Sequence, residues 1–176
     1  MTIDLNRNLL TLDYLTEQEK SAIDHELQIM ETREACSIEA LKIVQLQRGW
    51  ISDESLHAIA AYLRIPSADL EGVATFYNLI YRQPVGKYVI HVCNSISCHL
   101  CGYSEVMSAI KSHLSIDYGQ TTSDGMFTLL SNACLGACDR SPVMMIGNEQ
   151  YQNLTPQTVV DILETLHAAE NKEVSR

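Results

Sequence analysis

Two pairs of cysteines constrain the fold of this chain more than any other feature. Cys93 and Cys98 have the spacing C-x4-C, Cys134 and Cys138 have the spacing C-x3-C, and each pair follows an apolar run. The pairs are about one β-α-β unit apart, and the two parallel strands of such a unit end at the same edge of a sheet. Loops at that edge can supply two sulfurs to each of two irons. The pattern predicts a [2Fe-2S] cluster and electron transfer.

The composition excludes several classes of protein. A net charge of -10 opposes binding to nucleic acid or to anionic lipid. The first residues show no basic region leading into an apolar stretch, and no apolar run reaches the length needed to cross a bilayer. We therefore expect a cytosolic protein without membrane insertion. Six cysteines in such a chain favour metal binding or redox chemistry over structural disulfides.

The first half of the chain has helical periodicity. A first helix is expected near 16–31, and a second should end near Arg48, before Gly49. Two more helices follow, with Leu56 and Leu70 among their inward-facing residues. The expected N-terminal capping residues of the four helices are Thr16 with Glu19, Ser37, Ser52 and Ser67.

The second half alternates between strands and helices. A strand is expected at 88–92, a helix near 102–115 and a strand at 127–130. A hairpin through Gly147-Asn148 and a last helix that starts at Thr155 follow. The order β-α-β-β-β-α matches a thioredoxin-like α/β domain with a small mixed sheet. The whole chain is thus predicted to be α+β, with an N-terminal extension at 1–14, a helical bundle at 15–83, the cluster domain at 84–168 and a flexible tail at 169–176.

Other uses of the thiols remain open at this level. Zinc also accepts four thiolates, although its cysteine pairs are typically C-x2-4-C in knuckle-like turns. Cys98 and Cys101 form a C-x-x-C motif of the thioredoxin dithiol type, but that interpretation leaves Cys134 and Cys138 without a role. A Rieske-type site would need two histidines, for which His91 and His99 are the candidates beside the loop, yet four thiols already complete a cluster.

The remaining candidate residues have simpler interpretations. We expect Cys36 to be a packing residue and Cys101 to be a bystander near the cluster. The aromatic residues could form an electron path or an interface patch, but helical spacing favours the core for Trp50, Phe76, Tyr77 and Tyr81. Neither a G-x-G-x-x-G motif nor a Walker motif is present, so no nucleotide site is expected on this chain.

Three segments of the chain resemble the same family. They are VCNSISCHLCG, NACLGACDRSPVMMIG and LQRGWISDESLHAIAAYLRIPSADLEGVATFYNLIYRQPVGKYVIHVC. This family comprises the thioredoxin-like [2Fe-2S] E subunits of bacterial NADH:quinone oxidoreductase, respiratory complex I. The resemblance covers about residues 15–168. It implies that Cys93 and Cys98 bind one iron and that Cys134 and Cys138 bind the other. Cys101 departs from the family pattern, because members of the family generally lack a cysteine at this position.

The resemblance also implies an assembly. The chain would be an electron-transfer subunit of a redox-driven proton-translocating oxidoreductase, at the cytoplasmic side of the inner membrane. It would contact the flavin-bearing F subunit and the iron–sulfur G subunit, with FMN and NADH bound only by the partner. Related subunits occur in NAD-reducing hydrogenases and NAD-linked formate dehydrogenases, and these are the alternative. A thioredoxin-type dithiol protein that uses Cys98 and Cys101 is the alternative from another class.

Overall fold

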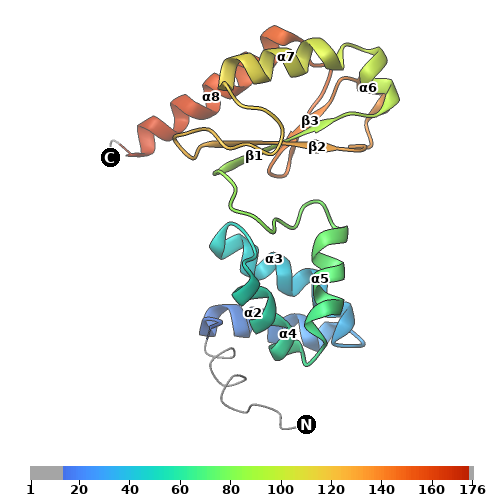
Figure 1. Cartoon of the computed structure of the whole chain (residues 1–176), viewed down its shortest axis with the longest axis vertical. Helices are drawn as coiled ribbons and strands as arrows, with labels where there is room; N and C mark the ends of the chain where they lie inside the picture. Colours follow the sequence, from blue (N-terminus) through green and yellow to red (C-terminus); the bar gives the residue numbers. More distant parts are fainter. Residues whose placement is uncertain (1–13, 175–176) are drawn as a thin grey trace. The chain divides into compact units, whose positions relative to one another are not determined.

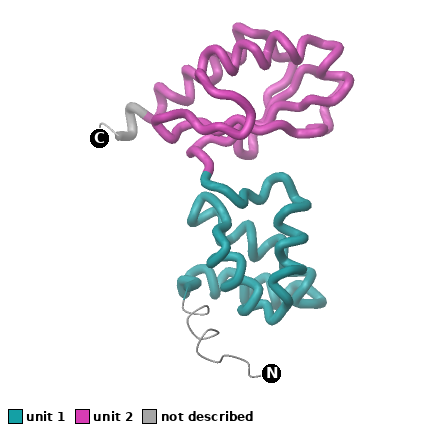
Figure 2. The backbone as a smooth tube through the Cα atoms, viewed as in Figure 1, with its two compact units in different colours: residues 1–84 teal, residues 85–176 magenta. Residues whose placement is uncertain are grey.

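The computed structural model describes residues 14–174, with side chains described as far as residue 170. Most of the expected extension, residues 1–13, lies outside the described residues. The chain divides into two compact units, which we call the helical unit, ending at Pro84, and the sheet unit, beginning at Val85 (Figure 2). Among the described residues, no helix has the combination of length and apolarity needed to cross a membrane.

The helical unit packs its helices around one apolar core (Figure 1). Fully buried side chains from three of the helices meet there, among them Ile23, Leu41 and Leu63. The elements in chain order are α2 (Glu17–Ile29), the 3-10 helix η1 (Glu34–Cys36), α3 (Ser37–Arg48), α4 (Asp53–Leu63) and α5 (Ser67–Phe76).

The helix starts agree with two of the four expected caps. The Thr16 side chain accepts a hydrogen bond from the Glu19 amide as part of a complete capping box, and Ser52 caps α4. The expectations for Ser37 and Ser67 are wrong, because both are already the first residue of their helices. Before Ser37, η1 places the backbone in the helical region, whereas a capping residue needs an extended backbone.

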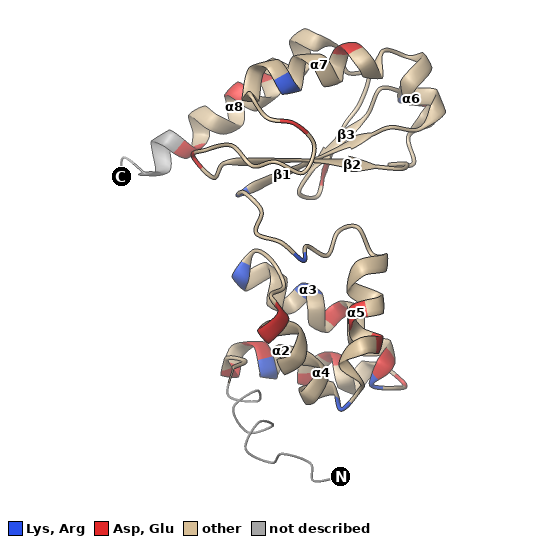
Figure 3. Ribbon diagram, in the orientation of Figure 1, with Lys and Arg blue, Asp and Glu red and all other residues tan. Residues whose placement is uncertain are grey.

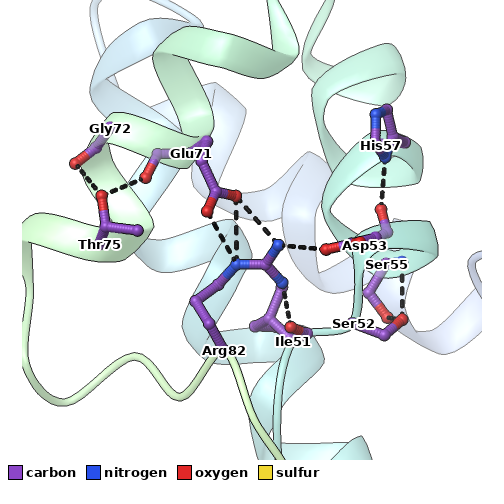
Figure 4. Close-up of polar contacts among 9 residues, drawn as sticks. All are labelled: Ile51, Ser52, Asp53, Ser55, His57, Glu71, Gly72, Thr75 and Arg82. Atoms are coloured by element: carbon purple, nitrogen blue, oxygen red, sulfur yellow. Dashed lines mark hydrogen bonds and ion pairs between the residues drawn. The ribbon is translucent and has the colours of Figure 1, made fainter.

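Arg82 ties the segment after α5 to two helices (Figure 4). Its guanidinium donates to Glu71 at 3.1 Å and to Asp53 at 2.6 Å, and also to the carbonyl of Ile51. Gln45 donates to the carbonyl of Leu79 at 2.8 Å in the same segment. The chain that leaves the helical unit is therefore fixed by side-chain contacts as far as Arg82.

The sheet unit is built on four strands in the order β2-β1-β3-β4. β1 runs parallel to β2 and antiparallel to β3, while β3 and β4 form the expected hairpin, so the sheet is mixed. The elements in chain order are β1 (Tyr88–Cys93), α6 (Ile96–Leu100), α7 (Tyr103–Leu114), β2 (Phe127–Asn132), the 3-10 helix η2 (Cys138–Arg140), β3 (Met144–Ile146), β4 (Glu149–Tyr151) and α8 (Pro156–Val174).

Helices α7 and α8 cover one face of this sheet (Figure 1). Ile90 of β1 and Leu129 of β2 are register partners, and both are fully buried against Ile110 of α7 and Leu163 of α8. Alternate residues of each strand thus build the core. This packing holds β1 and β2 parallel, which places the loops after their last residues at one edge of the sheet.

The sheet unit differs from the expectation at two places. The loop after Cys93 contains the short helix α6, which the sequence analysis missed. Helix α8 continues to Val174, through residues that were expected to form a flexible tail from 169. Its start agrees with the expectation, because the Thr155 hydroxyl accepts from the Thr158 amide at 3.2 Å and caps the helix.

Two of the four aromatic residues assigned to the core of the helical unit are exposed. Phe76 is 79% exposed and Tyr77 is 42% exposed, so the prediction of core packing is wrong for both. Trp50 and Tyr81 are partly buried, in better agreement with that prediction. Phe76 is the last residue of α5. Helical periodicity therefore does not determine whether its side chain points into the core.

Candidate iron–sulfur site

The parallel pairing of β1 and β2 positions both cysteine loops. Cys93 is the last residue of β1, and its register partner is Asn132, the last residue of β2. Cys134 comes two residues later, so the two loops leave the same edge of the sheet. The Asn94 amide donates to the carbonyl of Asn132 at 3.0 Å, which continues the ladder to the start of both loops.

The first pair of thiols is buried. Cys93 is 2% exposed and Cys98 is 1% exposed, and both pack against Val143, which precedes β3. α6 carries Cys98 back towards the strand that ends in Cys93, and the two cysteines lie in one buried group with Val143. The structure therefore brings the first expected ligand pair together.

The second pair of thiols is exposed. Cys134 precedes Gly136, whose φ of 80° requires a conformation that favours glycine. This turn directs the Gly136 amide at the Cys134 sulfur, with 3.4 Å between nitrogen and sulfur. Cys138 begins η2. The glycine thus lets the loop backbone face its own cysteine.

Contacts across the site join the two loops. Leu135, in the second loop, packs against the buried group formed by Cys93, Cys98 and Val143, and its backbone lowers the pKa of the Cys93 thiol. Ser141 donates to the carbonyl of Cys138 at 3.0 Å, and its hydroxyl oxygen lies 3.4 Å from the Cys98 sulfur. The second loop therefore reaches both cysteines of the first, through Leu135 and Ser141.

The environment separates the acidities of the buried thiols. Burial raises the pKa of the Cys93 thiol, but hydrogen bonds from Ser95, Cys98 and Leu135 outweigh burial and lower its pKa below the usual value. The pKa of Cys98 is raised by burial and by the neighbouring Cys93. Two neighbouring thiols that share one proton have one lowered and one raised pKa in this way. The thiolate is the form of cysteine that binds metal.

The chemistry of the donor set fits a [2Fe-2S] cluster. All six cysteines lie within the described residues and are free thiols. Among residues 14–174, no group of three or more His, Cys, Asp or Glu side chains is arranged around a single metal ion. A [2Fe-2S] cluster needs only two thiolates at each iron, whereas a structural zinc site needs four ligands around one ion. Two pairs of thiols on two loops match the two thiolates that each iron of such a cluster requires.

Charged side chains are nearly absent from the cysteine loops. Neither 88–104 nor 126–138 contains Asp, Glu, Lys or Arg, and Figure 3 shows α6 without charged residues. A cluster with four thiolates is an anion, so its charge must be offset by dipoles. The Gly136 N–H that points at the Cys134 sulfur is one such dipole and needs no cationic side chain.

The other candidate residues take different places. Cys101 is exposed at the end of α6, and Cys36 is buried in the helical unit. His99 is exposed, and its ring lies 5.7 Å from that of Tyr103. Burial lowers the pKa of His91 in β1, which keeps its imidazole neutral.

Three residues at the site were missed by the sequence analysis. Ser95 and Ser141 have hydroxyl groups beside the buried sulfurs, and Tyr103 packs against the buried group that contains both cysteines. A signal was available for Ser95, which follows Cys93 by two residues and can fold back on it. Ser141 and Tyr103 reach the site through tertiary packing, so local spacing alone could not single them out.

A thioredoxin-like sheet with thiols gathered where its parallel strands end defines a small thiol-ligated metal or redox protein. Comparison with known proteins makes this class specific, because a profile of the thioredoxin-like [2Fe-2S] ferredoxin family matches residues 23–167. The chain belongs to this family. The resemblance stated from the sequence motifs is thereby confirmed.

Individual relatives are similar over most of their length. The chain is 52% identical over 150 residues to the E subunit of the NADH-quinone oxidoreductase of Escherichia coli (strain K12), covering 85% of this chain and 90% of the relative. It is 48% identical over 159 residues to the corresponding protein of Pseudomonas aeruginosa (strain PAO1), covering 89% and 96%. Both relatives carry the name of one component of an oxidoreductase complex.

A solved structure shares the fold. An NAD+-reducing [NiFe]-hydrogenase in the air-oxidized state matches with a TM-score of 0.63 and 21% identity, over 73% of this chain. The match spans 23% of the hydrogenase chain. At this identity the likeness supports the architecture alone.

Proposed function

We propose that this chain is the [2Fe-2S] electron-transfer subunit of a respiratory NADH:quinone oxidoreductase. The observation that carries the proposal is 52% identity to an E subunit over 85% of the chain. In this role the chain is part of an enzyme and needs no nucleotide site of its own. When bound, the cluster supplies one-electron redox chemistry.

The proposed ligands are Cys93, Cys98, Cys134 and Cys138. The contact that supports a shared site is the packing of Leu135, in the second loop, against the buried group formed by Cys93, Cys98 and Val143. Cys93 and Cys98 would hold one iron from within the core, and the exposed pair would hold the other. Ser95 and Ser141 would orient the buried sulfurs, and backbone N–H groups would offset their charge.

The proposed domains follow the division of the chain. The helical domain at 15–83 would serve assembly, and the domain at 84–168 would hold the cluster. The helical unit has a complete apolar core of its own, so holding the cluster does not require it for packing. The presence of a helical unit that the cluster domain does not need for its own packing supports a binding role.

The proposed partners are the flavin-bearing F subunit and the iron–sulfur G subunit of the same complex. FMN and NADH would bind to the partner, because this chain has no phosphate-binding glycine motif. Through that assembly the chain would lie at the cytoplasmic side of the inner membrane, without inserting into it. A net charge of -10 supports a protein partner over nucleic acid or anionic lipid.

Cluster content and ligand substitution test the site. Anaerobically purified protein should contain iron and sulfide in near-equal amounts and no zinc. Cys134→Ala should lose the cluster, whereas Cys101→Ala is the matched control, because Cys101 is also exposed and lies outside the ligand set. Zinc without iron, or loss of the cluster in Cys101→Ala alone, would overturn the ligand assignment.

Co-purification tests the assembly. A tagged chain should capture a flavin-containing protein together with a quinone-linked membrane arm. Capture of a hydrogenase or a formate dehydrogenase would instead support the alternative that the shared fold suggests.

The dithiol alternative has its own test. Cys98 is buried, and Cys101 is exposed between the end of α6 and Gly102, which precedes α7, so only one thiol of the motif is accessible. We expect no insulin reduction by the purified protein. Reduction that disappears in Cys101→Ala would establish a dithiol function.

A further inference from the structure

Tyr103 connects the core of the sheet unit to the buried thiols. It is the first residue of α7 and is partly buried. Its side chain packs against the apolar core around Ile90 and also against the group formed by Cys93, Cys98 and Val143. An aromatic ring in this position occupies space that water would otherwise take beside the sulfurs.

A second tyrosine holds this ring in place. The hydroxyl oxygens of Tyr103 and Tyr118 are 2.6 Å apart, a short hydrogen bond between the first residue of α7 and the loop that follows the helix. Lys111 lies over the Tyr118 ring at 5.2 Å and pairs with Asp117 at 2.6 Å. Burial, the bond to Tyr103 and the charge of Asp117 raise the pKa of Tyr118, so the phenol stays protonated at neutral pH.

We propose that Tyr103 is a positioning residue that closes the helix side of the cysteine site against water, and that the Tyr118 hydroxyl locks it there. The redox part of this inference rests on the proposed function, whereas the shielding of Cys93 and Cys98 does not. Cys93 and Cys98 lie on the covered side of the site, and the exposed pair lies outside the cover. Tyr103 thus acts on the environment of the sulfurs without binding iron.

Thiol alkylation of the metal-free protein measures directly how well Tyr103 shields Cys93 and Cys98 from solvent. N-ethylmaleimide labelling at Cys93 and Cys98, resolved by peptide mass spectrometry, should be about fivefold faster in Tyr103→Phe, as expected for the loss of one hydrogen bond. Tyr118→Phe removes the same bond from the other side and should give the same rate. The double variant should be no faster than either single variant, since only one bond is lost.

The matched control is Tyr62→Phe. The Tyr62 hydroxyl donates to Asp24 at 2.8 Å in the helical unit, so this change removes a tyrosine hydrogen bond without touching the sheet unit. Its labelling rate at Cys93 and Cys98 should equal that of the unchanged protein. Equal rates in Tyr103→Phe, Tyr118→Phe and the control would overturn the proposal.

Protein that contains the cluster gives an independent measurement, the midpoint potential of that cluster. Water beside the sulfurs stabilises the more negative reduced cluster, so Tyr103→Phe and Tyr118→Phe should shift the midpoint potential to more positive values. Their visible spectra should also bleach faster in air than that of Tyr62→Phe. An unchanged potential together with unchanged labelling overturns the proposal. Faster labelling in protein that binds no iron supports the shield and contradicts the proposed function.

Discussion

Glu19 shows how a single buried carboxylate organises the start of the helical unit. Its side chain is 0% exposed and accepts two hydrogen bonds from Arg48, each at 2.7 Å. It also accepts from the Thr16 amide at 2.8 Å, which completes the capping box of α2. Arg48 donates in turn to the carbonyl of Tyr14. One charge therefore joins α2, α3 and the segment before them.

We expect Glu19→Gln to destabilise the protein by about 3 kcal/mol, because Arg48 keeps its charge and loses its partner. Urea unfolding at pH 7 measures the change. Glu17→Gln is the control, since Glu17 pairs with Lys20 on the surface and such pairs contribute less than about 1 kcal/mol. Equal losses in the two variants would contradict a special role for Glu19.

The same carboxylate predicts a dependence of stability on pH. Burial raises the pKa of Glu19, but hydrogen bonds from Arg48 and Thr16 outweigh burial and lower its pKa below the usual 4.5. The folded state thus binds the proton less tightly than the unfolded state, so the contribution is present above pH 4.5 and is lost as the pH falls below it. The stability difference between wild type and Glu19→Gln should narrow below that pH in urea titrations. A constant difference would show that the charge is irrelevant.

At the scale of single residues, the sequence predicts the four cysteines as ligands but does not predict the residues that surround them. Paired spacing is a local property, so it could be read without a structure. The contacts of Leu135, Ser141 and Tyr103 with the sulfurs depend on β3 and α7 packing beside the loops. The exposed position of Phe76 likewise depends on where α5 ends, which periodicity does not define.

Among the elements, the start of α4 offers a clean test of capping. Ser52 accepts from the Ser55 amide at 3.2 Å, and its hydroxyl donates to the buried Ser55 hydroxyl. Ser52→Ala should cost about 1 kcal/mol of unfolding free energy, measured by thermal unfolding monitored by far-ultraviolet circular dichroism. Ser67→Ala is the control, because Ser67 lies inside α5 after Pro66 and caps nothing. The capping account fails if both variants lose the same stability.

The helices also show which features the sequence pattern does not predict correctly. Strands and long helices were predicted because their side chains repeat with the period of the element. α6 has five residues, too few for a period to appear, and two of its apolar side chains, Ile96 and Leu100, are exposed. Ser37 has the chemistry of a cap, but the preceding η1 turn removed the extended backbone that capping needs.

Arg82 should hold the segment after α5 in place. Arg82→Met keeps the aliphatic stem and removes the donors to Glu71, Asp53 and Ile51, so we expect a loss of about 2 kcal/mol. Hydrogen exchange should become faster at the amides of Ile80 and Tyr81 in particular. Lys42→Met, which breaks an exposed pair with Glu39, should leave exchange at those amides unchanged. Unchanged exchange in Arg82→Met would show that backbone contacts suffice.

For the whole molecule, the important feature is that the two apolar cores have no residue in common. One is built from residues between Leu15 and Ile80, and the other from residues between Ile90 and Leu163. All four proposed ligands belong to the sheet unit. Binding energy from the cluster should therefore stabilise one core and not the other.

Hydrogen exchange of loaded and cluster-free protein tests this separation. Loss of the cluster should reduce protection at Ile90 and Leu129, while protection at Leu41 and Leu63 stays the same. Cys101→Ala should keep the loaded pattern. If Leu41 lost protection together with Ile90, the chain would unfold as one cooperative unit and a single unfolding free energy would describe it.

The unequal exposure of the two thiol pairs has a consequence for the order in which the protein is damaged. In the cluster-free chain, oxidants and electrophiles meet Cys101, Cys134 and Cys138 at the surface, while Cys93 and Cys98 are covered. Sulfinic or sulfonic acids should therefore accumulate first in the second loop, where they cannot be reversed by ordinary thiols. A sample stored in air would keep half of its ligands intact and yet be unable to recover the cluster.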